Sequence, residues 1–243
     1  HTSAIGYTKN EEDLQKFSQK ASDAYFIAKE EENLSIHENL VNHMHTVTSS
    51  DVLNSYYKQS YLDNLLRGGS PLLYETKSGM IGYHIYSRKH GDLERDYNFF
   101  SLEPNYYSQG NGNFRDVLQN RRSDLYFFPK IGDSNIYQFA SLISADGYNP
   151  LSIEGLKFVY EGKEVVDNKL KTILAKEFTP GEVVAYLKEL NKPVDESLRA
   201  ILKESSVVVK ASFGEGYWED HFTYLDDVID AFCDIYPDKV SEL

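Results

Sequence analysis

Cysteine is almost absent from this sequence, since Cys233 is the only one among 243 residues. A single thiol excludes an intrachain disulfide and a zinc-thiolate cluster. Because a chain without disulfides suits a reducing compartment, we expect a cytoplasmic location. The Gly110-x-Gly112 pair lacks the third glycine of a dinucleotide-binding fingerprint. We therefore expect neither a metal nor an organic cofactor.

Basic residues are also scarce: 25 Lys and Arg face 38 Asp and Glu, for a net charge of -13. This balance argues against nucleic acid as a partner, because phosphate backbones bind to basic surfaces. It argues equally against an anionic membrane surface. No apolar run approaches the length of a transmembrane helix, and the polar first ten residues predict no signal peptide.

An initiator methionine is missing as well. The chain begins His-Thr-Ser, and its first methionine is Met44. We therefore expect residues 1–243 to be one fragment of a larger catalytic domain, with the remainder of the parent polypeptide as its partner. Formation of a homo-oligomer is left open.

What the sequence does contain is a dense polar stretch at residues 110–124. Two glycines, four amides, three arginines and two acids surround a short apolar pivot there. Amides and an adjacent Arg-Asp pair present both hydrogen-bond donors and acceptors, which is the mixture that sugar hydroxyls require. The alternative is a glycine-capped helix start with internal ion pairs.

A second cluster, residues 214–224, contains the only tryptophan, Trp218, followed closely by Asp220 and His221. An aromatic platform beside a carboxylate can hold a sugar ring and protonate its glycosidic oxygen. The alternative is an ordinary helix start, with acidic residues before the apolar run that begins at Leu225.

The hydrophobic periodicity predicts a mainly α fold with long polar loops. We expect helices at 10–32, 51–66 (with Asp51 as the N-cap), 114–126, 135–145, 195–204 and 222–236, and another that a capping box at Thr179–Glu182 opens. Residues 70–110 are expected to be irregular, 156–166 to form a short hairpin, and 206–210 a strand. Residues 155–210 are plainer than their flanks and are expected to form a small inserted subdomain that contains the hairpin.

The run Gly110, Gly112, Phe114, Arg115, Asp116, Gln119 and Asn120 resembles a motif of the cellobiose phosphorylase family. These proteins are inverting glycoside phosphorylases with an (α/α)6-barrel catalytic domain. The resemblance implies that this chain is part of such a barrel. In the family the Arg-Asp pair binds the sugar that is transferred, a role that would fall on Arg115 and Asp116. Gln119 belongs to the same motif and is expected to bind substrate too.

The family also carries a Trp-x-Asp element, whose aspartate is the general acid, and Trp218-Glu219-Asp220 is similar to it. The resemblance therefore makes Asp220 the catalytic acid, with Trp218 and the neighbouring Tyr217 as sugar contacts. We expect Trp218, Tyr217 and Phe222 to desolvate Asp220 so that it keeps its proton.

An inverting phosphorylase would cleave a β-linked di- or oligosaccharide with inorganic phosphate as co-substrate, giving a sugar 1-phosphate. Attack by phosphate requires cations, and His221 and Arg122 are candidates for binding it. Two alternatives remain. An inverting glycoside hydrolase would use a second carboxylate, such as Glu215 or Glu219, to activate water. A non-catalytic sugar-binding or structural helical domain would need no acid at all.

Overall fold

The computed structural model describes residues 5, 8, 10–87, 105–163, 167–214 and 218–243 of the chain. Within these residues the protein is mainly helical, as the periodicity predicts. The chain divides into two compact units, residues 1–62 and 63–243. Helix α3 (Asp51–Gly68) contains the division point. In the described part of the chain, no helix is both long enough and apolar enough to cross a membrane.

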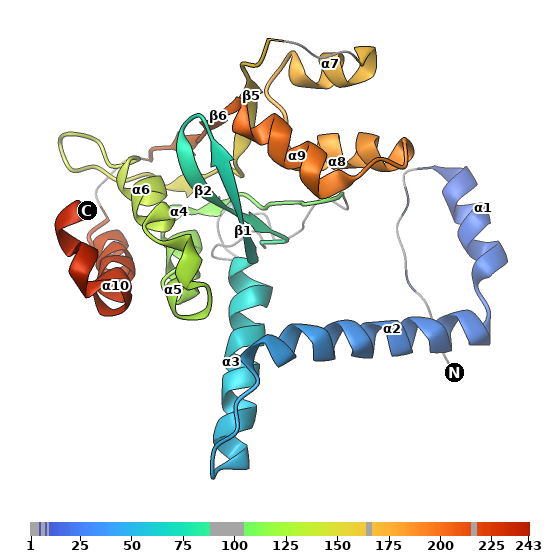
Figure 1. The fold of residues 1–243 in the computed structure, drawn as a ribbon, viewed down its shortest axis with the longest axis horizontal. Coiled ribbons are helices and arrows are strands. Elements are labelled where there is room, and N and C mark those ends of the chain that lie inside the picture. The colour runs from blue at the N-terminus through green and yellow to red at the C-terminus, as the bar shows by residue number, and fades with distance from the viewer. Residues whose placement is uncertain (1–4, 6–7, 9, 88–104, 164–166, 215–217) are drawn as a thin grey trace. The chain divides into compact units, whose positions relative to one another are not determined.

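The first unit consists of helices joined by short turns (Figure 1). They are α1 (Glu11–Lys20), α2 (Asp23–Val41), the 3-10 turn η1 (Asn42–Met44) and the first part of α3. The single helix expected at 10–32 is therefore wrong. Ser22 is extended, with φ of -141°, and its side chain accepts a hydrogen bond from the Tyr25 amide at 3.2 Å. This N-cap ends one helix and begins the next.

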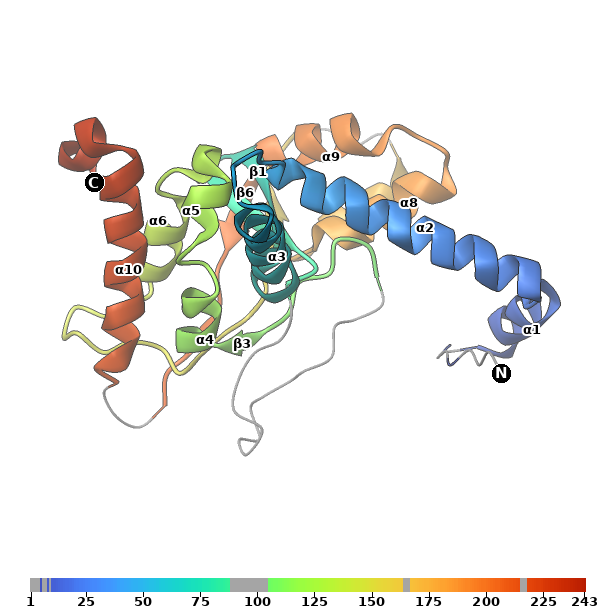
Figure 2. The ribbon, with the colours of Figure 1, turned by 90° about the horizontal axis from the view of Figure 1, so that it is seen from below.

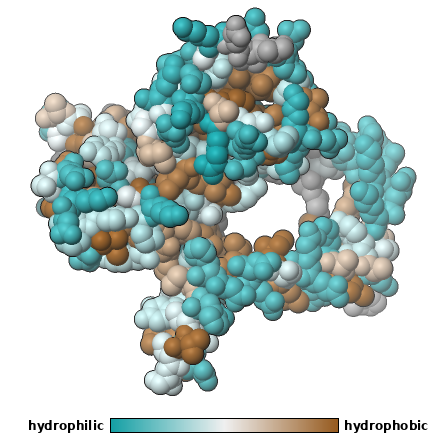
Figure 3. Space-filling view, in the orientation of Figure 1, coloured by the Kyte–Doolittle hydropathy of each residue, from teal (hydrophilic) through white to brown (hydrophobic). Residues whose placement is uncertain are grey.

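The start of α3 corrects a second expectation. Asp51 is the first helical residue and not the cap, since the Ser50 hydroxyl accepts from the Leu53 amide at 3.3 Å. The end agrees with the sequence: Gly68 is the last helical residue, and Gly69 has a φ of +82°. Apolar side chains of the first unit are largely exposed, and Figure 3 shows them as brown groups among teal along α2.

The second unit begins with a β-hairpin that the sequence did not predict. Strand β1 (Ser70–Thr76) pairs antiparallel with β2 (Gly79–Ile85), so the expectation of an irregular stretch at 70–110 is wrong for residues 70–85. Gly82 allows the close packing of β2 on its neighbours, because a Cβ there would lie 3.0 Å from the Ile131 side chain. Residues 88–104 of that stretch lie outside the described residues.

The remaining elements of the second unit follow in chain order. They are β3 (Gly112–Asn113), α4 (Phe114–Gln119), α5 (Asp124–Phe127), η2 (Pro129–Ile131), α6 (Ser134–Ala140), β4 (Ser152–Ile153), β5 (Lys157–Tyr160), α7 (Asn168–Leu174), α8 (Pro180–Glu189), α9 (Val194–Lys203), β6 (Ser205–Val208), β7 (Ala211–Ser212), α10 (Asp220–Ile235) and η3 (Pro237–Glu242).

Residues 164–166 of the hairpin expected at 156–166 lie outside the described residues. In the described part, strand β5 pairs antiparallel with β6, which follows α9, and Phe158 also bridges to Phe178. The helix expected at 114–126 is likewise two short helices, because a turn separates α4 from α5. The capping box is confirmed: Thr179 and Glu182 exchange both hydrogen bonds at the start of α8.

Two hydrophobic cores organise the second unit, and Figures 1 and 2 show the helices of each core grouped together. In the first core, α4, α5 and α6 pack against α10. In the second, β5, α7, α8 and α9 pack against the β1–β2 hairpin, which contributes Tyr74 and Tyr83. The boundaries of an inserted subdomain at 155 and 210 stay a prediction.

Candidate functional site

The Arg115–Asp116 pair lies in the first turn of α4, and its position follows from the local sequence. The Asn113 side chain accepts from the Arg115 amide at 3.0 Å, so an amide caps this helix and not a glycine. Phe114, Val117 and Leu118 are buried in the first core, at the i, i+3, i+4 spacing of one helix face. The same geometry turns Arg115 and Asp116 away from that core.

Arg115 joins the two polar clusters of the sequence. Its Nε donates to Asp116 Oδ1 at 3.0 Å, and its Nη1 donates to Asp220 Oδ2 at 3.2 Å. Asp220 is the first residue of α10 and lies 105 positions further along the chain. The structure therefore brings the residues expected to bind sugar into contact with the residue expected to act as the acid.

The contacts with Asp116 and Asp220 keep Arg115 protonated. Partial burial opposes the charge, but the hydrogen bonds and charges of Asp116 and Asp220 outweigh it and raise the pKa of the guanidinium. Arg115 is consequently cationic throughout the physiological pH range. It presents a fixed fork of donors, the geometry that suits carboxylates and sugar hydroxyls.

Asp220 itself is not desolvated by aromatic side chains. Its side chain is 54% exposed, and its one described ion pair is with Arg115. This corrects the expectation that Trp218 and Phe222 would remove it from water. Tyr217 and Glu215 lie outside the described residues, and Glu219 is exposed.

Trp218 and His221 form an aromatic stack beside the ion pair. Their rings are parallel, with centroids 5.7 Å apart, and His221 also stacks on Phe114 at 5.7 Å. The Asn149 side-chain amide donates to the Trp218 carbonyl at 2.8 Å, which fixes the backbone just before α10. Asn149 is buried, and nothing in its sequence context pointed to this positioning role.

His221 is buried between these rings, with only 3% of its surface exposed. Burial lowers the pKa of its imidazole below the usual value of 6.5, although Asp220 acts in the opposite direction. The ring is therefore neutral near pH 7. A buried, neutral imidazole is a weak ligand for phosphate, which does not favour the expected phosphate-binding role.

Arg122 forms a second ion pair with α10. Its Nη1 lies 3.1 Å from Asp227 Oδ2, and its guanidinium stacks 6.0 Å from the Tyr224 ring centre. Both side chains of the pair are partly exposed, so solvent screens it. Gln119 is half-buried and lies one turn after Arg115, on the same face of α4.

Comparison of the chain with protein-family models, with curated proteins and with solved structures found no match. Within the described residues, no three His, Cys, Asp or Glu side chains are grouped closely enough to hold a metal ion. The geometry of Arg115, Asp116, Trp218 and Asp220 is therefore the basis on which a function is argued.

Proposed function

We propose that this chain contributes to the inverting phosphorolysis of a β-linked di- or oligosaccharide, as part of an (α/α)6 barrel in the cytoplasm. The observation that carries the proposal is the 3.2 Å contact between Arg115 and Asp220. It unites a sugar-binding motif with a carboxylic acid next to a tryptophan. Those three elements are what cleavage of a glycosidic bond requires.

In the proposed reaction Arg115 and Asp116 bind hydroxyls of the sugar that is transferred, and the ring lies against Trp218. Asp220 donates its proton to the departing glycosidic oxygen. A phosphate oxygen attacks the anomeric carbon from the opposite face, the glycosidic carbon–oxygen bond breaks, and a sugar 1-phosphate of inverted configuration forms. Water is not consumed.

In this mechanism the bound substrate changes the surroundings of Asp220 in two ways. In the free protein Arg115 forms an ion pair with Asp220. A sugar that takes over the hydrogen bonds of Arg115 would release Asp220, and its ring would shield the exposed carboxyl group from water.

The chain offers Arg115 and Arg122 as cations near α10 for the phosphate. Binding at Arg122 would require exchange of its contact with Asp227, which is weak because it is exposed. His221 acts in this proposal as the support on which Trp218 stacks. The remainder of the parent polypeptide supplies further barrel helices.

A second candidate is an inverting glycoside hydrolase on the same scaffold. The observation that favours it is that one guanidinium holds two carboxylates, Asp116 and Asp220. An inverting hydrolase needs two carboxyl groups, about 6.5–9.5 Å apart, of which one activates water. Dependence on phosphate separates the two reactions.

The test is incubation of the chain, alone and within its parent protein, with β-linked disaccharides in the presence and absence of inorganic phosphate. Phosphorus NMR should detect a sugar 1-phosphate. Asp220→Asn should lower turnover by about 10²–10⁴-fold but should largely spare a glycosyl fluoride, whose leaving group needs no proton.

Asp234→Asn is the matched control, because Asp234 also lies on α10 and accepts a hydrogen bond at an exposed position, from Tyr126. It should leave turnover unchanged. Phosphate-independent release of free sugar would favour the hydrolase. Sugar binding without turnover in the parent protein would refute both enzymes and favour a binding module.

A further inference from the structure

A cavity of about 200 Å³ lies in the second unit, away from the Arg115–Asp220 pair. Residues 105–109 and Asn111 form one wall, the segment 155–157 forms another, and Tyr83 and Thr179 also line the cavity. Figures 1 and 2 show α8 and α10 on opposite sides of this unit. The cavity is thus separate from the candidate catalytic residues.

The wall at residues 105–111 contains one residue with an energetically unfavourable backbone conformation. Tyr107 has a φ of +51°, a left-handed value that costs a non-glycine residue about 1 kcal/mol or more. The Tyr83 hydroxyl donates to the Tyr107 carbonyl at 2.9 Å and maintains it. Behind Tyr106, a Cβ at Gly181 would collide with the Tyr106 carbonyl oxygen. The segment is therefore fixed before any ligand arrives.

Two amide side chains connect this wall to the facing one. Gln109 Oε1 accepts from the Leu156 amide at 2.6 Å, and Asn111 Oδ1 accepts from the Gly155 amide at 2.9 Å. These bonds cross between segments that are more than forty residues apart in the chain. Both walls are consequently rigid relative to each other, which lowers the entropy cost of binding.

The lining indicates the class of ligand. Phenol rings, side-chain amides and hydroxyls surround the cavity, and Lys157 is the one charged side chain among the lining residues. Lys157 lies 3.8 Å from Glu154, so the pair is close to neutral. A cavity that offers donors, acceptors and aromatic faces without net charge suits a neutral polyhydroxyl compound better than an anion.

The size restricts the ligand further. About 200 Å³ holds roughly seven water molecules, which is the space of a single sugar ring. Tyr106 is 44% exposed at the rim, and the Lys188 ammonium lies 4.5 Å from its ring centre. A tyrosine held in this way is a platform for the apolar face of a pyranose.

We propose that this cavity is a second carbohydrate subsite that binds one neutral sugar unit between Tyr106 and the side-chain amides of Asn105 and Asn111. The inference goes beyond the proposed function, because sugar binding here requires no catalysis. It would anchor a distal unit of an oligosaccharide, or a free monosaccharide.

The experiment is a titration of the full chain with glucose, cellobiose and maltose, followed by backbone amide shifts in NMR spectra. Residues 105–111 should shift. Tyr106→Ala should weaken binding at this cavity about tenfold, the loss expected for one aromatic–sugar contact. Asn105→Ala, an exposed lining residue, should weaken it as well.

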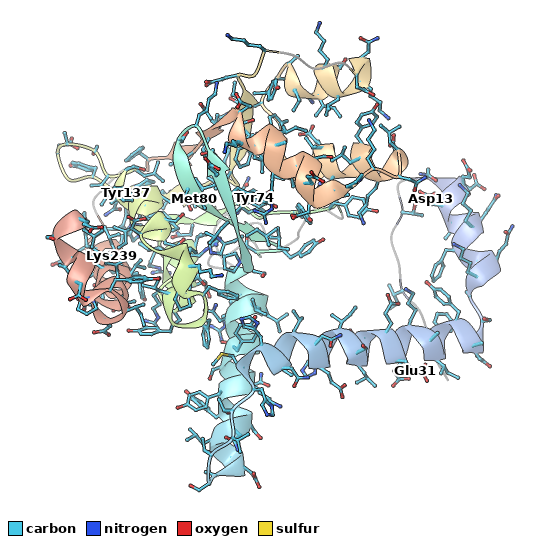
Figure 4. The ribbon with its side chains drawn as sticks, in the orientation of Figure 1. Asp13, Glu31, Tyr74, Met80, Tyr137 and Lys239 are labelled. Carbon is cyan, nitrogen blue, oxygen red and sulfur yellow. The ribbon has the colours of Figure 1, made fainter. Side chains whose placement is uncertain are left out.

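Tyr137→Ala is the matched control. Tyr137 is a similarly exposed tyrosine on α6 and borders a different cavity of about 480 Å³, together with Met80 of β2 (Figure 4). It should leave the affinity unchanged. Arg115→Ala should weaken sugar binding at the catalytic site but leave the shifts at residues 105–111, so the two proposals can fail independently. Wild-type affinity in both cavity variants, or no binding of the three sugars, would overturn the proposal.

Discussion

His84 Nε2 lies 2.6 Å from Asp124 Oδ2, and both side chains are buried. Asn64 and Asn135 each donate to the same carboxylate at 3.1 Å, so Asp124 connects α3, β2 and α6 to α5. Arg121 is buried beside it, and its Nε and Nη1 have no hydrogen-bond partner among the residues that the structure describes. This cluster is a structural centre of the second unit.

Removal of the Asp124 carboxylate should be strongly destabilising. Asp124→Ala leaves the buried Arg121 without its neighbouring acid and the side-chain amides of Asn64 and Asn135 without an acceptor, which should cost about 3–5 kcal/mol of unfolding free energy. Asp227→Ala, which breaks the exposed pair with Arg122, should cost about 1 kcal/mol or less. Urea denaturation measures both, and equal losses would contradict a structural role for Asp124.

The same carboxylate should make stability depend on pH. Burial raises the pKa of Asp124 from 3.8 to about 6, against the opposing effects of Arg121 and the two asparagines. The folded protein therefore binds this proton more tightly than the unfolded chain. Its contribution is complete below pH 3.8 and is lost as pH rises through about 6, by up to about 1.4 kcal/mol per pH unit.

The measurement is the unfolding free energy of the wild type minus that of Asp124→Asn, at a series of pH values from about 3.5 to about 7. This difference removes the contributions of titrating groups that do not interact with Asp124. It should fall with increasing pH. A difference that rises with pH would mean that His84 and Arg121 stabilise the ionised carboxylate more than burial opposes it.

The capping box of α8 should contribute about 1 kcal/mol. Thr179→Ala removes the acceptor for the Glu182 amide and should lower stability by that amount. Thr172→Ala is the control, since Thr172 lies at an exposed position of α7 and its hydroxyl donates to the Asn168 carbonyl. If the denaturation midpoint falls equally in both variants, the capping box does not stabilise α8.

Two glycines with nearly the same backbone angle should respond differently to alanine. Gly69 has a φ of +82° and Gly147 a φ of +86°. A Cβ at Gly69 would lie 2.7 Å from the Ile85 carbonyl oxygen, whereas a Cβ at Gly147 has nothing within 4 Å. Gly147→Ala should cost only the left-handed conformation, about 1–2 kcal/mol. Gly69→Ala should cost clearly more, and thermal melts would compare them.

Sugar binding should depend on Arg115. Arg115→Ala removes charge-assisted hydrogen bonds and should weaken binding at the catalytic site by about 1.5–3 kcal/mol. Arg67→Ala is the control, because Arg67 forms an exposed i,i+4 pair with Asp63 on α3. Calorimetric titration with cellobiose measures the change. Unchanged affinity in Arg115→Ala would remove this arginine from the site.

Some local elements of the fold could be predicted from the sequence, although the β1–β2 hairpin was missed, and the pairing of distant strands could not be predicted. The capping box at Thr179 is contained within four residues, so the sequence shows both partners. Strand β5 was paired with the wrong partner because its neighbour, β6, is separated from it by α7, α8 and α9. Turn residues near Gly162 indicated a reversal of the chain but not where the next strand lies.

In the candidate site too, the residues could be selected from the sequence, but their contacts and burial could not. Arg115, Asp116 and Asp220 were selected by residue type and by a family resemblance, and the structure adds that one guanidinium contacts both acids. The exposure of Asp220 and the burial of His221 depend on the packing of α10 against α4, which no local pattern encodes. The contact between His84 and Asp124 was missed because the two residues lie 40 positions apart in the chain.

The two acids held by Arg115 differ in when they become available during synthesis. Asp116 is its chain neighbour, so that contact can form as soon as α4 folds. Asp220 follows 105 positions later, and its contact must await closure of a long loop. At ribosomal rates of elongation this delay is about 5–20 seconds. For that interval only one of the two acids that contact Arg115 is present in the nascent chain.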